Sequence, residues 1–182
     1  MLMRRAESFL LIVDLQGKLM PAMRRGAEAL KTSGRLIRAA RALGVPVRVS
    51  EHCAERIGPT EEGLRALLRP EEILRKTHFS LAEEPQALAD LRALGRPLAA
   101  VTGAEAHVCV LQSALGLKAA GFAPVVVADA VSSRFESDEA AGLARLAAAG
   151  VPVVTSEMVM FEWLGEAQDP AFREVLALIK ER

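Results

Sequence analysis

The sequence is short of the residues that several protein classes require. It holds only two cysteines in 182 residues, Cys53 and Cys109, with no CxxC pair, which excludes a disulfide framework and a cysteine-rich zinc module. Basic and acidic residues number 23 each, without a basic run, so the electrostatic footprint of a nucleic-acid-binding protein is missing. The apolar run at residues 9–13 is too short to span a bilayer. These absences predict a cytoplasmic protein with a small-molecule partner, and no nucleic-acid or membrane partner.

Motifs for binding nucleotides or accepting a phosphoryl group are absent as well. No GxGxxG follows the first apolar run, and no GxxxxGK[ST] occurs anywhere in the chain. The acidic pair that a phospho-receiver domain places beside its modified aspartate is also missing. A nucleotide-binding or receiver function is therefore disfavoured, although a doubly wound fold alone would allow either.

Six short apolar runs rich in β-branched residues are typical of buried strands. They lie at about residues 9–13, 45–50, 73–76, 98–102, 125–128 and 151–155. Helical patterns separate most of them, and four of these helical stretches end at a glycine that a proline soon follows. The glycines are Gly44, Gly95, Gly121 and Gly150. This alternation predicts an α/β fold, a three-layer doubly wound domain with a parallel sheet, formed as a single domain over residues 1–182.

Three further segments carry specific expectations. The irregular connection at residues 51–72 is expected to overhang the site, and the segment from Pro170 onward is expected to form a docked terminal helix. The apolar residues at 158–164 exceed what one helix face needs, which predicts a subunit contact and a homo-oligomer, a dimer or higher.

Three chemically complementary side chains follow predicted strands, where open α/β sheets bind their ligands. They are Asp14, Lys76 and Cys109. Taken singly, each has an ordinary explanation, as a turn residue, a solvated strand end or a small buried hydrophobe. Together, Asp14 supplies a base for the thiol proton, while Lys76 and a helix N-terminus are expected to lower the thiol pKa. The trio predicts a cysteine nucleophile.

Four motifs connect these residues to a known family. They read LLIVDLQ at 10–16, KTHFS at 76–80, GAEAHVCVLQ at 103–112 and DAVSSR at 129–134. Their sequence and order resemble the isochorismatase-like cysteine hydrolases, most closely the branch called isochorismatase domain-containing proteins, over nearly the whole chain. The resemblance implies an isochorismatase-like six-stranded sheet of order 3-2-1-4-5-6 and an Asp14–Lys76–Cys109 triad. It also implies an oxyanion hole at a cis peptide between Ala104 and Glu105, where the amides of Glu105 and Cys109 face the substrate oxygen.

The resemblance further implies hydrolysis of a small amide-type C–N bond through an acyl-thioester, without a cofactor. Nicotinamidases of the superfamily bind a metal with an Asp-x-His and a further histidine, but residues 50–56 read SEHCAER, so no metal is expected. True isochorismatases lack the cysteine that is present here. The substrate stays open, and the alternative is a non-enzymatic interaction protein that retains the fold.

Residues beside the triad positions are expected to line the substrate pocket. They are Gln16, Phe79, Ser80 and His107. His107 is assigned a structural role in preference to that of the base, and His52 and Cys53 are assigned to the surface or to packing. Asp129 and Arg134 are expected to form a structural ion pair or a cap.

Overall fold

The computed structural model describes residues 1–181 and contains a six-stranded sheet in the order β3-β2-β1-β4-β5-β6. Every strand pair is parallel, so the predicted fold class and strand order are confirmed. The strands are β1 (Ser8–Val13), β2 (Val47–His52), β3 (Ile73–Lys76), β4 (Leu98–Ala104), β5 (Ala123–Ser132) and β6 (Val153–Val154). The helices are α1 (Gly26–Leu43), α2 (Ala54–Ile57), α3 (Glu62–Arg65), α4 (Pro85–Ala93), α5 (Leu111–Ala119), α6 (Glu136–Ala148), α7 (Ser156–Leu164) and α8 (Phe172–Lys180).

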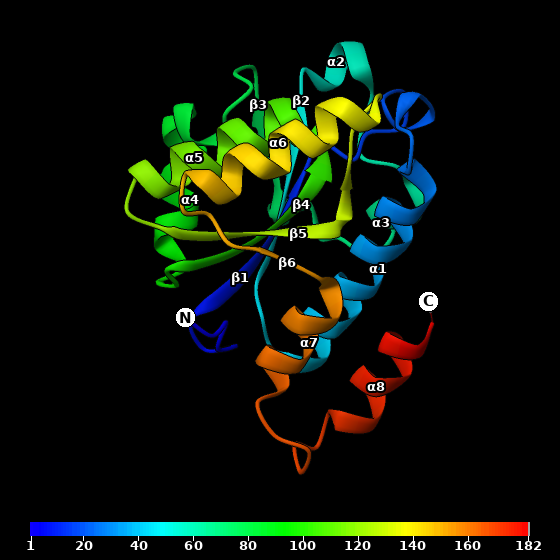
Figure 1. Cartoon of the computed structure of the whole chain (residues 1–182), viewed down its shortest axis with the longest axis vertical. Helices are drawn as coiled ribbons and strands as arrows, with labels where there is room; N and C mark the ends of the chain where they lie inside the picture. Colours follow the sequence, from blue (N-terminus) through cyan, green and yellow to red (C-terminus); the bar gives the residue numbers. More distant parts are fainter. Residues whose placement is uncertain (182) are drawn as a thin grey trace.

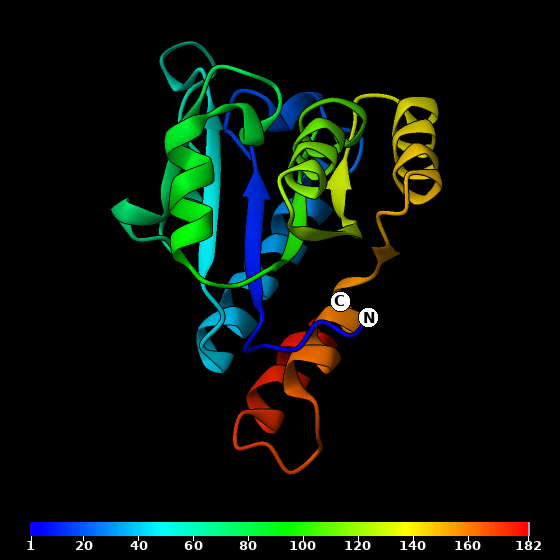
Figure 2. The same ribbon diagram turned by 90° about the vertical axis from the view of Figure 1, so that its left-hand side faces the viewer.

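Helices cover both faces of the sheet and produce the three predicted layers (Figure 1). Leu10 and Ile12 of β1 point toward the core under α1, α7 and α8. Leu11 and Val13 of the same strand point toward the core under α4, α5 and α6. Figure 2 shows the central strands between these two layers. Because both faces are buried, β1 is a continuous apolar run, as expected of a central strand in a parallel sheet.

The strand boundaries depart from the prediction mainly at one edge of the sheet. β6 has only two residues, because Thr155 leaves the sheet to cap α7 and its side chain accepts a hydrogen bond from Met158 N. β5 is longer than expected and continues to Ser132, with a register shift against β4 between Val101 and Gly103. At the other edge β3 has four residues, so both edge strands are short.

The helix-end glycines adopt the left-handed backbone that their positions suggested. Gly44 has a φ of 66°, and its amide donates to carbonyls in the last turn of α1. The docked terminal helix is also present, as α8 buries Val175 and Ile179 against the core that includes α1 and α7. Within residues 1–181, no helix combines the length and the apolar character needed to cross a bilayer.

The connection after β2 is held by one buried carboxylate. Glu51 Oε1 accepts hydrogen bonds from Thr60 N at 2.8 Å, from Thr60 Oγ1 at 2.9 Å and from Arg65 Nη1 at 2.8 Å. Gln16 binds the same connection, as its Nε2 donates to the carbonyls of His52 and Gly58. The Glu51 bonds hold the connection to itself, and the Gln16 bonds fasten it to the segment after β1, beside the predicted site.

Candidate active site

The three predicted triad residues come from three different strand ends of the sheet. Asp14 directly follows β1, and Lys76 is the last residue of β3. Cys109 lies in a π-helical turn, η4 (Ala106–Val110), which connects β4 to α5. The aspartate has a left-handed backbone with a φ of 53°, a conformation that is uncommon for a residue with a side chain and that concentrates at functional sites.

Lys76 joins the other two members of the cluster. Its Nζ lies 2.7 Å from Asp14 Oδ2 and 3.6 Å from Cys109 Sγ. The side chains of Lys76 and Asp14 are at most 1% exposed, and Cys109 is 5% exposed. β2 lies between β1 and β3, so the long lysine side chain spans one strand to reach the aspartate. The structure therefore brings together the three residues that the sequence grouped.

A serine that the sequence analysis did not single out orients Asp14. Ser50 lies opposite Val13 in the β1–β2 register, one residue before the aspartate. Its hydroxyl donates to Asp14 Oδ1 at 2.7 Å, and its carbonyl accepts from Asp14 N at 3.1 Å. Both carboxylate oxygens of Asp14 are thus engaged, one by Ser50 and the other by Lys76.

Lys76 is held by the turn that follows β3. Its Nζ donates to the carbonyls of His78 and Phe79, each at 3.1 Å. Glu84 organises that turn, because its Oε1 accepts from Thr77 N at 2.7 Å and from His78 N at 3.0 Å. These backbone bonds lower the pKa of Glu84 to about 2. Glu84 is a second residue that the sequence analysis missed.

The surroundings of Cys109 raise the pKa of its thiol, contrary to the expected lowering. Burial, followed by the negative charge of Asp14, raises the pKa of Cys109 to about 12, and the positive charge of Lys76 offsets only part of this. A hydrogen bond to Asp14 also favours the protonated thiol. The expectation was wrong because it weighed the cation and the helix terminus but not the desolvation of the sulfur.

The expected cis peptide between Ala104 and Glu105 is also wrong, since residues 1–181 contain only trans peptide bonds. The chain turns out of β4 through positive φ angles instead, 140° at Gly103 and 57° at Glu105. The glycine is required, because a Cβ at position 103 would lie 2.2 Å from Val13 O. The Glu105 carbonyl then accepts from the amides at 108 and 110, which closes the turn that carries Cys109.

Gln16 does not present its amide to a substrate. The side chain is fully buried, its Nε2 donates to His52 O and Gly58 O, and its Oε1 accepts from His52 N at 2.8 Å. Phe79, in contrast, is 51% exposed, and its ring packs against the His52 ring with centroids 5.4 Å apart. Of these two expected pocket residues, only Phe79 offers a side-chain surface to a ligand.

Ser80 and His107 line a shared cavity of about 540 Å³, next to α5 and Arg145. His107 Nδ1 lies 3.0 Å from Ser133 Oγ, and its ring also approaches Glu105 and Asp138, consistent with the structural role assigned to it. Glu105 itself is paired with Arg134, whose Nε lies 3.0 Å from its Oε1.

Lys76 lines a different cavity, of about 310 Å³. Cys53, Thr77 and Glu84 also line it, which places Cys53 beside the cluster. Within residues 1–181, no group of three or more His, Cys, Asp or Glu side chains is arranged to hold a metal ion.

Known proteins resemble this chain in sequence and in fold. The family model described as "Isochorismatase domain" matches residues 8–158. The chain belongs to the isochorismatase-domain family. Isochorismatase domain-containing protein 1 of Salmo salar is 37% identical to it over 169 residues, which are 92% of this chain and 59% of that protein. The chain therefore spans about six-tenths of the length of this curated relative.

Solved structures confirm the isochorismatase-like fold. A protein named MAR1 ribonuclease from Caenorhabditis elegans superposes with a TM-score of 0.93 at 34% identity, covering 99% of this chain and 93% of that one. The YcaC gene product of Escherichia coli, described as an octameric hydrolase of unknown specificity, superposes with a TM-score of 0.87 at 18% identity. The superposition covers 98% of this chain and 96% of the YcaC chain. The chain thus has the fold of the isochorismatase-family hydrolases with an Asp14–Lys76–Cys109 cluster at the strand ends.

Proposed function

We propose that this isochorismatase-domain protein is a cysteine-dependent hydrolase of small amide-type substrates, acting at a C–N bond through an acyl-thioester. The observation that carries the proposal is the buried contact of Lys76 Nζ with both Asp14 Oδ2, at 2.7 Å, and Cys109 Sγ, at 3.6 Å. A thiol, a carboxylate and an ammonium group in contact supply a nucleophile, a base for its proton and a fixed positive charge.

Acylation begins from the neutral thiol. Asp14 takes the proton of Cys109 as the sulfur attacks the carbonyl carbon, which forms the S–C bond and moves the carbonyl π electrons onto oxygen. As the carbonyl re-forms, the C–N bond breaks, and the leaving nitrogen takes the proton from Asp14 and departs as ammonia or an amine. Because the thiol pKa is raised to about 12, proton transfer has to accompany attack on a bound substrate.

Deacylation uses the same groups, but water is now the nucleophile and the Cys109 sulfur is the leaving group. Asp14 takes a proton from water, the resulting hydroxide adds to the thioester carbon, and the C–S bond breaks with its electron pair on sulfur. The proton on Asp14 then returns to Cys109. Throughout, Lys76 stays bound to the carbonyls of His78 and Phe79, which keeps its positive charge next to the sulfur and the aspartate.

The oxyanion hole remains part of this proposal. The backbone amides of Val108 and Val110 already donate to Glu105 O, at 2.9 and 3.2 Å. We therefore assign the substrate oxygen to the Cys109 amide, which lies between them, together with the Glu105 amide at the turn.

The test is a screen of small primary and secondary amides for release of ammonia or amine, with intact-mass detection of the acyl-enzyme. We expect turnover in the wild type and in Cys53→Ala, which removes the other thiol. Cys109→Ala should abolish turnover and the mass adduct, whereas Asp14→Asn should slow it by about 100-fold or more, as expected on loss of a general base. Release of ammonia or amine that persists in Cys109→Ala refutes the mechanism.

Ribonuclease activity is a second candidate, because the C. elegans structure with a TM-score of 0.93 carries that name. The equal numbers of acidic and basic residues, without a basic run, favour the amide substrate, since RNA binding relies on neutralising phosphates. An unstructured RNA oligonucleotide belongs in the same screen. Cleavage that disappears in Cys109→Ala would replace the amide by a phosphodiester as the substrate of this site.

The non-enzymatic alternative and the oligomeric state are tested together. Met158 and Phe161 of α7 are 46% and 42% exposed, while the other apolar residues of that helix pack inward, so an apolar strip supports the proposed homo-oligomer. Light scattering measures the assembly. A screen without turnover for amides or RNA, from a correctly folded protein, would favour the interaction protein.

A further inference from the structure

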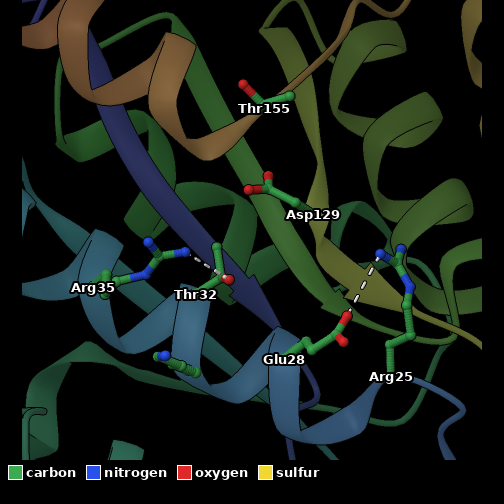
Figure 3. A pocket seen from close by; sticks show the side chains of 7 residues that line it. Arg25, Glu28, Thr32, Arg35, Asp129 and Thr155 are labelled. Atoms are coloured by element: carbon green, nitrogen blue, oxygen red, sulfur yellow. Dashed lines mark hydrogen bonds and ion pairs between the residues drawn. The ribbon is translucent and has the colours of Figure 1, made fainter. Parts of the chain in front are cut away.

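A third cavity, of about 500 Å³, lies apart from the residues of the candidate active site. It opens between α1 and the point where β6 gives way to α7, where the early end of β6 leaves part of β5 without a neighbouring strand (Figure 3). Its walls are formed by Arg25, Glu28, Lys31, Thr32, Arg35, Asp129 and Thr155. None of the triad residues lines it.

Arg35 is the unusual member of this wall. It is only 3% exposed, and within residues 1–181 no carboxylate lies within ion-pair distance of its guanidinium. Its Nη2 donates to Thr32 Oγ1 at 3.0 Å, its Nη1 makes a long 3.5 Å contact with Leu178 O, and its Nε has no partner. A buried guanidinium normally has a counter-charge, because desolvating an unpaired cation is unfavourable.

The positive charges of the cavity wall that lack an ion pair lie on one side, on α1. Arg25 is neutralised, since its Nη2 lies 2.5 Å from Glu139 and its Nη1 lies 3.8 Å from Glu28. Lys31 lies one turn before Arg35 in α1 and lines the same cavity, and within residues 1–181 it forms no ion pair. Glu181 attracts both cations at longer range, but its carboxylate is already paired with Arg38 at 2.6 Å. An anion placed here would meet Lys31 and Arg35 with the Thr32 hydroxyl between them.

The opposite wall offers acceptors. Asp129 is held in place by α7, as its Oδ1 accepts from Ser156 N at 2.7 Å and its Oδ2 from Ser156 Oγ at 2.6 Å. This cap is one of the two roles expected of Asp129. Each carboxylate oxygen retains a further lone pair, which suits a ligand hydroxyl. Figure 3 shows Asp129 and Thr155 on one side of the space and the α1 side chains on the other.

We propose that this cavity binds a small hydroxylated phosphate ester. The phosphate group lies against Arg35, Lys31 and Thr32, whose several donors suit a tetrahedral oxyanion, and the hydroxyl groups donate to Asp129. The site is separate from the triad, so it does not depend on the amide reaction. Its occupant completes the charge balance of Arg35.

The test is phosphorus NMR and calorimetry with ribose 5-phosphate, inorganic phosphate and unphosphorylated ribose at constant ionic strength. We expect saturable binding of ribose 5-phosphate, weaker binding of inorganic phosphate and none of ribose. Arg35→Met should weaken binding by about 10-fold or more, the usual effect of losing a charge-assisted hydrogen bond. Arg38→Met is the matched control, because it removes the same charge from α1 at a surface pair with Glu181.

Two further variants keep the proposal testable if Arg35→Met does not fold. Thr32→Val and Lys31→Met each remove a donor while leaving the buried guanidinium in place, and each should weaken phosphate binding by a few-fold. Absence of saturable binding, or equal losses in Arg38→Met, overturns the proposal. So does an oligomer that dissociates in Arg35→Met while phosphate gives no signal, because the cavity would then be a subunit contact.

Discussion

Cys109 should resist iodoacetamide at neutral pH. The thiolate is the reacting species, and a pKa of about 12 in place of the ordinary 9.0 lowers its population at pH 8 by about 10³-fold. The labelling rate should therefore rise about tenfold per pH unit without a plateau below pH 11. Cys53 in the same chain is partly exposed, so it serves as an internal reference.

Two substitutions should move the Cys109 profile in opposite directions. Asp14→Asn removes the negative charge and leaves Lys76 next to the sulfur, so the thiol pKa should fall and labelling at pH 8 should accelerate by about 10-fold or more. Lys76→Met removes the positive charge that favours the thiolate and should slow labelling further. Mass spectrometry of peptides that contain Cys109 or Cys53, sampled over time from pH 6 to 11, measures both rates.

The reasoning is refuted by a labelling profile that levels off below pH 8.5, because Cys109 would then be a thiolate in the resting protein. Slower labelling in Asp14→Asn would also contradict it, since the aspartate would then be activating the thiol before substrate binds. A change confined to Cys53 would show that the substitutions altered accessibility and not the charge around Cys109.

Three other predictions concern the supports of the site. Ser50→Ala removes the donor to Asp14 Oδ1 and should lower kcat by about 10-fold, the effect of about 1.5 kcal/mol. It should also cost about 1–3 kcal/mol in denaturant unfolding, because it leaves a buried carboxylate oxygen without its hydrogen bond. Folding lowers the Glu84 pKa to about 2, so the ionised carboxylate stabilises the wild type above pH 4.5, and this stabilisation is lost as the pH falls toward 2. Glu84→Gln should remove it. After allowance for solvent screening this amounts to about 1 kcal/mol, and urea titrations at pH 3 and pH 6 measure it; an equal loss at both values would contradict the assignment. Gly103→Ala should cost more than about 3 kcal/mol in denaturant unfolding, because the added Cβ would lie 2.2 Å from Val13 O. A near-neutral result would show that β1 and β4 are not in such close contact at this position.

The pattern of apolar residues and the glycines at helix ends were sufficient to predict most of the fold. Buried parallel strands are short apolar runs, and few residues other than glycine adopt the positive φ at helix ends. The six strands and their alternation with helices can therefore be predicted from the sequence. The strand order came from the family resemblance. The end of β6 was missed, because the side-chain cap that Thr155 makes on α7 competes with strand propensity.

The grouping of Asp14, Lys76 and Cys109 was predicted, but the charge state of the thiol was not. Desolvation depends on how tightly the surrounding segments close over the sulfur, and a linear sequence does not contain that information. Ser50 was findable in principle, since it ends the second apolar run and that strand neighbours β1. Glu84 could not be found from the sequence, because a glutamate before a proline is equally typical of an ordinary helix start.

The short edge strands have a consequence for how copies of this protein can associate. With four residues in β3 and two in β6, these two edge strands expose few unpaired backbone amides and carbonyls to a foreign strand. On the part of β5 that extends beyond β6, the Arg25 side chain donates to the carbonyls of Ala128 and Val131. β6 also follows Pro152, which has no amide proton to donate. Copies therefore cannot readily extend one another's sheets, which protects the folded chain against fibrillar aggregation. Specific assembly is left to side-chain contacts between helices.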